Sequence, residues 1–109
     1  MLERVDRMQL AVTDRQLAAR TFERLLATRP LREDMSEYLN ARRTIVAMGE
    51  SELELCEPAG AGPVDHHLKQ WGEGLFAAGF STSDLDGLAA RLSAQGAAFT
   101  RERDQLHLP

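Results

Sequence analysis

The sequence predicts an α+β fold made of two tandem βαβββ modules, the second of which is incomplete. Three observations lead to this prediction: a strand–helix unit in residues 72–96, a second copy of it 70 residues earlier, and short alternating strands between the two. A repeat constrains the architecture, because each copy must bury its apolar face against the rest of the chain. With 109 residues, the chain is expected to form a single domain.

Residues 72–96 carry the clearest local pattern. The small apolar residues 75–80 predict a strand that is buried on at least one face. Ser83 is expected to cap the next helix, and Gly96 to end it in the left-handed conformation. Apolar residues recur between them at helical spacing: Leu85, Leu88, Ala89 and Leu92.

The earlier copy aligns without a gap. Residues 8–12 match residues 78–82, and Asp14 matches Asp84. Two unrelated strand–helix units remain an alternative, since amphipathic helices resemble one another. The shared cap position and unbroken register favour a true internal repeat.

The first copy opens with a strand at residues 5–12. Arg7 and Gln9 lie on one face of this strand and Met8 and Leu10 on the other, so the first face is expected to be wet or to bind a ligand.

A helix should follow this strand. Thr13 and Gln16 form a capping box at its start, and Pro30 blocks its continuation. Its predicted apolar face comprises Ala18, Phe22, Leu25 and Leu26.

The middle of the chain reads as a connector followed by strands. Residues 31–36 have no clear period and are expected to be a polar connector, while residues 37–39 and 43–48 predict a strand pair turning near Asn40. Gly49 and Glu50 suit a hairpin loop into a strand at residues 51–57. In that strand Leu53 and Leu55 should face the core, and Glu52, Glu54 and Cys56 the opposite side.

These elements divide the domain into module one (residues 1–57), a linker (58–73) and module two (74–109). The linker contains an Ala-Gly-Ala-Gly-Pro run that is typical of a loop. Strands are expected at residues 97–103 and 105–108, with a turn at Asp104. Module two is therefore expected to lack its last strands, and the open sheet edge favours a homodimer.

Charge and hydropathy limit the classes of partner that the chain is expected to bind. The 13 basic and 17 acidic residues give a net charge of -4, which argues against nucleic acid. No apolar run approaches the roughly 18 residues of a membrane span, and charged residues fill the N-terminus, so a cytoplasmic protein without a membrane partner is expected.

Five segments of the chain carry a wider pattern: VDRMQLAVTD, FERLLA, SELELCEP, GEGLFAAGF and SDLDGLAARLSAQG. In these segments the sequence resembles the vicinal oxygen chelate (glyoxalase/bleomycin-resistance/dioxygenase) superfamily. The pattern is most similar to methylmalonyl-CoA epimerase-like members. The resemblance implies a curved sheet around a pocket, with metal ligands from four strands.

The ligand positions implied by the resemblance depart from the family pattern. The two histidine ligands of the family correspond to Arg7 and Ala77 in this sequence, and neither side chain binds a divalent cation. The fourth-strand ligand falls on Glu54, which matches, and the last-strand glutamate would lie beyond Pro109. One carboxylate does not make a metal site of three or four ligands, so no cofactor is expected. A divalent metal at Glu54 stays as the alternative.

We hypothesise that Arg7 takes the place of the cation. Arg7, Gln9 and Glu54 are expected to line the pocket, where the guanidinium would pair with Glu54 or with an anionic ligand. The alternative is an ordinary rim salt bridge that binds nothing.

Three functions stay open. The first, favoured by the missing ligands, is a glyoxalase-like protein with a degenerate metal site that binds an anionic or acyl-type small molecule, as drug-sequestering members do. The second is a metal-dependent enzyme of the methylmalonyl-CoA epimerase or lactoylglutathione lyase type. The third is a non-catalytic module of a larger dioxygenase-like assembly.

Overall fold

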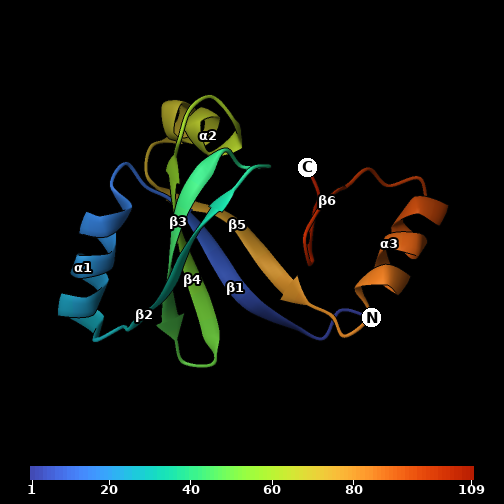
Figure 1. The fold of residues 1–109 in the computed structure, drawn as a ribbon, viewed down its shortest axis with the longest axis horizontal. Helices are drawn as coiled ribbons and strands as arrows, with labels where there is room; N and C mark the ends of the chain where they lie inside the picture. Colours follow the sequence, from blue (N-terminus) through green and yellow to red (C-terminus); the bar gives the residue numbers. More distant parts are fainter.

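The computed structural model describes residues 1–109 as a five-stranded sheet, three helices and a separate two-stranded hairpin (Figure 1). The strands are β1 (Arg4–Ala11), β2 (Pro30–Ser36), β3 (Ala41–Met48), β4 (Ser51–Pro58), β5 (Gly74–Ser81), β6 (Thr100–Glu102) and β7 (Gln105–His107). The helices are α1 (Arg15–Leu26), α2 (Pro63–Trp71) and α3 (Leu85–Ala94).

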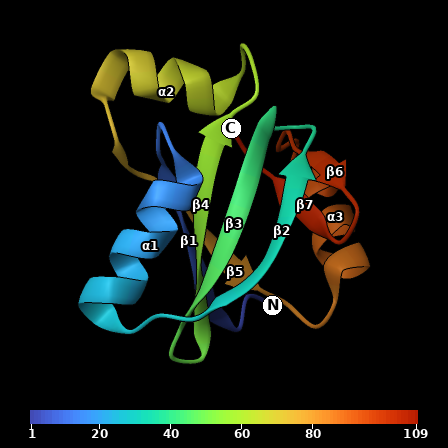
Figure 2. The same ribbon diagram turned by 60° about the vertical axis from the view of Figure 1, so that its left-hand side comes forward.

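The main sheet has the order β2-β3-β4-β1-β5. β1 runs parallel to β4, whereas the other neighbouring strands are antiparallel. Helix α1 packs on β3 and β4, and α2 lies across one end of the sheet (Figure 2). Helix α3 lies away from the main sheet and contacts β7.

The 70-residue repeat is visible in the strand pairing at the centre of the sheet. Adding 70 to the bounds of β1 gives the bounds of β5. Met8 pairs with Ala78, its own counterpart, at the middle of the antiparallel ladder. The end pairs, Arg4–Ser81 and Ala11–Gly74, exchange under the same shift. The two strand–helix units are therefore related by a local two-fold arrangement, while the division into modules stays a prediction.

The caps of α1 and α3 differ from the expected ones. Asp14, not Thr13, caps α1 and accepts hydrogen bonds from the amides of Gln16 and Leu17. Asp84, not Ser83, caps α3 by accepting from the amide of Gly87. An aspartate one residue further along reaches the free amides of the first turn better than the preceding hydroxyl.

The residues expected to be caps bind the other unit instead. Thr13 donates its backbone N–H (2.9 Å) and its hydroxyl (3.2 Å) to Glu73, just before β5. Reciprocally, the backbone N–H of Ser83 donates to Glu3, just before β1. Glu3 and Glu73 are also 70 residues apart, so each unit binds the cap region of its counterpart.

Two buried clusters fill the core, one on each side of the sheet. The cluster under α1 comprises Val12, Ala19, Val46, Leu53 and Leu55. The cluster under α2 comprises Ala11, Leu39, Ala41, Cys56 and Val64. Burial raises the pKa of the Cys56 thiol to about 12, which makes it a packing residue. No helix has the length and apolar character to cross a membrane.

The strand at residues 51–57 and its hairpin loop are confirmed by β4, but four other expectations were wrong. The polar connector at residues 31–36 is strand β2, and residues 37–39 form a turn. The predicted linker contains α2, whose first residue Pro63 suits a helix start. The strand predicted at 97–103 is only the short β6.

Burial also departs from the pattern in two places. The predicted buried strand exists as β5, yet Leu75 is 60% and Phe80 54% exposed, because neither α1 nor α3 covers this part of the sheet. On α1, Ala18 and Phe22 pack on the core as expected, but Leu25 and Leu26 are exposed.

Candidate functional site

The carboxylate of Glu54 lies at the centre of a buried polar cluster. Its side chain is fully buried on β4. Gln9 Nε2 donates to Oε1 over 2.7 Å, and Arg7 Nη1 donates to Oε2 over 3.1 Å. The strand register puts β1 residues beside β4, so the three residues singled out from the sequence lie together. Of the three, Arg7 lines the cavity described below, whereas Gln9 and Glu54 do not, and their role in binding stays a prediction.

Arg43 on β3 is the residue of this cluster that the sequence did not reveal. Its Nη1 donates to Glu54 Oε1 over 3.1 Å, while Nε and Nη2 form a bidentate pair with Asp34, both at 2.7 Å. Burial disfavours the charged guanidinium, but the bonds to Asp34 and the charge of Glu54 outweigh it and raise the pKa of Arg43. Asp34 was missed because β2 was expected to be a connector.

Arg7 keeps part of its guanidinium free. Its Nε donates to Asp6 over 3.2 Å and its Nη1 to Glu54, whereas no hydrogen-bond partner within the protein meets Nη2. Burial lowers its pKa, but these carboxylates outweigh burial and raise it. The cation is thus held firmly and retains an unused donor group.

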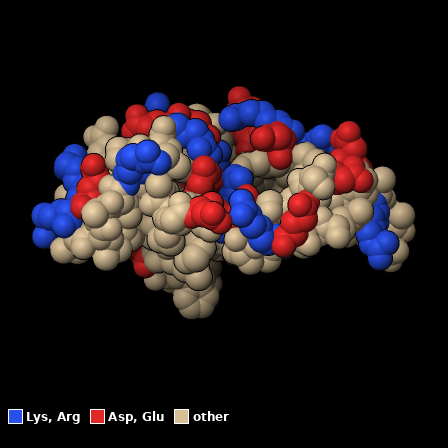
Figure 3. Space-filling model, turned by 90° about the horizontal axis from the view of Figure 1, so that it is seen from below, with Lys and Arg blue, Asp and Glu red and all other residues tan.

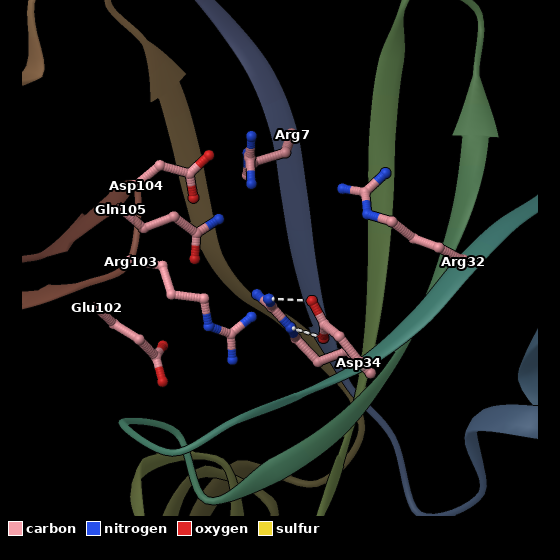
Figure 4. A pocket seen from close by; sticks show the side chains of 8 residues that line it. Arg7, Arg32, Asp34, Glu102, Arg103, Asp104 and Gln105 are labelled. Atoms are coloured by element: carbon pink, nitrogen blue, oxygen red, sulfur yellow. Dashed lines mark hydrogen bonds and ion pairs between the residues drawn. The ribbon is translucent and has the colours of Figure 1, made fainter.

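A cavity of about 310 Å³ opens above this cluster, between the main sheet and the β6–β7 hairpin (Figure 4). None of its lining side chains is hydrophobic: Arg7, Arg32, Asp34, Arg43, Glu102, Arg103, Asp104 and Gln105. Arg32 is engaged by Glu52 in a bidentate pair of 2.7 and 2.9 Å. The available donors of the cavity are therefore those of Arg7, Arg103 and Gln105.

The hairpin supplies half of the cavity lining. Figure 4 shows Arg103, Asp104 and Gln105 on one side of the space and Arg7 and Arg32 on the other. No sequence pattern marked Arg103, Asp104 and Gln105, because a three-residue strand carries too little periodicity to reveal its faces.

The donor set around Glu54 does not fit a metal ion. Both carboxylate oxygens already accept hydrogen bonds, and two of the three donors are cationic arginines that would repel a divalent cation. No group of three or more His, Cys, Asp or Glu residues is placed to hold a metal. Glu54 therefore has no carboxylate oxygen free of hydrogen bonds to offer a metal ion.

Charges of both signs are interspersed on the surface seen in Figure 3, without a broad patch of one sign.

Comparisons with known proteins place this geometry in a family. Residues 6–107 match the family model described as the Glyoxalase/Bleomycin resistance protein/Dioxygenase superfamily. A comparison with curated proteins finds no match.

Several solved structures share the fold. A variant of methylmalonyl-CoA epimerase from Streptomyces coelicolor, in complex with 2-nitronate-propionyl-CoA, superposes with a TM-score of 0.83 at 23% identity, covering 94% of this chain and 78% of the epimerase chain. For methylmalonyl-CoA epimerase from Mycobacterium tuberculosis the TM-score is 0.83 at 22% identity, with 93% and 69% covered. A hypothetical protein from Bacillus halodurans C-125 gives 0.76 at 19% identity, with 93% and 72% covered.

At these identities the structures establish the fold, whereas the family model spans nearly the whole sequence. The chain therefore belongs to the glyoxalase/bleomycin resistance protein/dioxygenase superfamily.

Proposed function

We propose that the chain binds a small anionic ligand in the polar cavity and that Arg7, rather than a metal ion, supplies the positive charge. The observation that carries the proposal is the state of Arg7. Two carboxylates fix its guanidinium, Glu54 and Asp6, and its Nη2 has no protein partner beside the cavity. A preorganised guanidinium loses little freedom when it binds a carboxylate or phosphate group.

The second anion donor would be Arg103, opposite Arg7. Its Nη2 donates to the carbonyl oxygen of Met35 over 2.6 Å, and this bond orients the guanidinium while leaving its other N–H groups for a ligand. The absence of hydrophobic lining residues disfavours an apolar molecule inside the cavity. A carboxylate or phosphate group is the ligand chemistry that fits.

Two simple anions serve as probes of this site: malonate, a small dicarboxylate, and inorganic phosphate. Saturable chemical-shift changes in two-dimensional NMR, centred on Arg7 and on residues 103–105, are expected for both anions. Hexanoate has one carboxylate and an apolar tail, so it should bind more weakly. Shift changes that are absent, or spread over the whole surface, would overturn the proposal.

A second candidate function is that of an epimerase-type enzyme whose substrate is a carboxyacyl thioester. It is favoured by the superposition on epimerases whose structures hold methylmalonyl-CoA or 2-nitronate-propionyl-CoA. Methylmalonyl-CoA added in deuterated water decides between the two. Exchange of its α-proton catalysed by the chain would favour the enzyme, and binding without exchange would favour the binding protein.

We also propose that the chain acts as a cytoplasmic homodimer. The face of β1 and β5 that points away from the cavity carries paired apolar side chains, Val5 beside Phe80 and Leu10 beside Leu75. Of these, Val5, Leu75 and Phe80 are more than half exposed, and α1 lies over β3 and β4 instead. An uncharged apolar face of this kind is typical of a protein interface.

A further inference from the structure

Half of the cavity lining belongs to a hairpin that has no place in the main sheet. Strands β6 and β7 have three residues each and pair only with one another. A hairpin of this length is not stable alone in water. Its position over the cavity must therefore be fixed by side chains.

One carboxylate makes most of that attachment. Glu102 Oε1 accepts from Ser36 Oγ at 2.8 Å, and Oε2 accepts from the backbone amides of Glu37 at 2.7 Å and Tyr38 at 3.2 Å. These donors lie at the end of β2 and in the turn that follows, 64 to 66 residues earlier in the chain. Ser36 is completely buried, so this contact reaches into the folded body of the domain.

A second contact reinforces Glu102 from the hairpin itself. His107 Nε2 lies 3.1 Å from Glu102 Oε1, and the His107 ring stacks on Tyr38 with centroids 4.3 Å apart. Burial alone would raise the pKa of Glu102, but the hydrogen bonds from Ser36, Tyr38, Glu37 and His107 lower it to about 2. The carboxylate is therefore ionised whenever the protein is near neutral pH.

The residues that follow Glu102 line the cavity together with it. Arg103 has a left-handed backbone (φ 54°) in the tight turn between β6 and β7, and its side chain extends over the cavity toward Met35. Gln105 pairs with Glu102 across the two strands and also lines the cavity. A shift of Glu102 would move both donors together.

From these contacts we infer that Glu102 is a positioning residue for ligand binding. Its hydrogen bonds attach the β6–β7 hairpin to the end of β2 and so place Arg103 opposite Arg7. This inference rests on the proposed anion site. Glu102 also lines the cavity, but its carboxylate oxygens accept from Ser36, Glu37 and Tyr38, so its effect on affinity passes through the hairpin donors that it positions.

A double-mutant cycle with malonate tests this inference. Glu102→Gln removes the charge that holds the backbone amides, and Arg103→Gln removes the donor that is positioned. We expect each to weaken malonate binding about tenfold, the scale of one charge-assisted hydrogen bond. The double variant should lose less affinity than the two single losses added together, since Arg103, the main donor that Glu102 positions, is already gone. Additive losses would overturn the inference, because they would mean that Glu102 acts independently of Arg103.

A measurement without ligand separates this inference from the proposed function. In Glu102→Gln, amide hydrogen exchange should become faster in residues 100–107 while the strands β1 to β4 keep their protection. Glu23→Gln, which changes an exposed carboxylate on α1, is the matched control and should leave exchange unaltered. Unchanged exchange in the hairpin would overturn the positioning role even if malonate binds. If malonate fails to bind the native chain while the hairpin loosens as expected, the anion site is wrong, and so is the role of Glu102 in binding.

Discussion

The side chain of Arg7 lies directly against Gly79, its neighbour on β5. A Cβ atom added at Gly79 would fall far inside the van der Waals distance of Arg7 Cγ and Cδ. The aliphatic stem of Arg7 thus lies against β5 where no side chain stands, while its guanidinium reaches Glu54 on β4.

The first prediction concerns this contact. Gly79→Ala should displace Arg7, break its bond to Glu54 and destabilise the fold by about 1–3 kcal/mol, the usual cost of overpacking. Urea denaturation measures the loss. In an Arg7→Ala background the same change should cost much less, because the clashing stem is gone. An equal cost in both backgrounds would show that Gly79 serves another purpose.

The second prediction compares two carboxylates on the same face of β4. Glu54→Ala leaves Arg43 buried with one partner fewer and should cost about 3–5 kcal/mol of unfolding free energy. Glu52→Ala breaks a partly exposed pair with Arg32 and should cost about 1 kcal/mol or less. Thermal and urea unfolding of the two variants provide the comparison. Similar losses for both would contradict the buried network described here.

Acid stability provides the third prediction. The pKa of Glu102 is lowered from 4.5 in the unfolded chain to about 2 in the fold. A lowered carboxyl pKa contributes stability above the unfolded value, and this contribution is lost as pH falls through the folded value. Part of the unfolding free energy should therefore disappear between about pH 4.5 and pH 2, most steeply in the middle of that window.

The control for this acid titration is Glu102→Gln, which cannot titrate. Its stability should be lower at neutral pH and should fall less than that of the native chain over the same range. Parallel curves for the two proteins would refute the assignment to Glu102. The pKa of Glu52 is also lowered, by its hydrogen bond to Arg32, so some decline should remain in both proteins.

The fourth prediction concerns the apolar face of β1 and β5. Phe80→Asp places a charge within the proposed dimer interface and should weaken association at least tenfold, since charges are depleted at interface cores. Sedimentation velocity over a range of concentrations measures the effect. Leu26→Asp, at a leucine that is 63% exposed on α1, is the matched control. A monomeric native chain would contradict the dimer.

The sequence revealed those parts of the fold in which local and long-range signals agree. The alternation in the strands at residues 5–12 and 51–57 was sufficient to assign Arg7, Gln9 and Glu54 to one face, and the structure places them in contact. Strand β2 was hidden because its sequence, PLREDMS, has the polar character of an edge strand. Asp34 and the pairing role of Arg43 were missed together with it.

The hydrogen bonds by which Glu102 attaches the hairpin could not be inferred from the sequence, for a different reason. Its donors are two backbone amides and a serine hydroxyl that lie more than 60 residues away. Such contacts depend on the tertiary position of a turn, and no local pattern encodes them. The exposure of Leu75 and Phe80 was likewise outside what an apolar strand pattern could show, because burial depends on which elements cover the sheet.

The most direct test of the central claim, that a guanidinium replaces the metal ion in this cavity, is calorimetric titration of malonate into chelator-treated protein. We expect saturable binding with one malonate per chain, unchanged when zinc or cobalt is added, and weakened about tenfold or more in Arg7→Gln. Malonate binding that appears only after a divalent metal is added would contradict it.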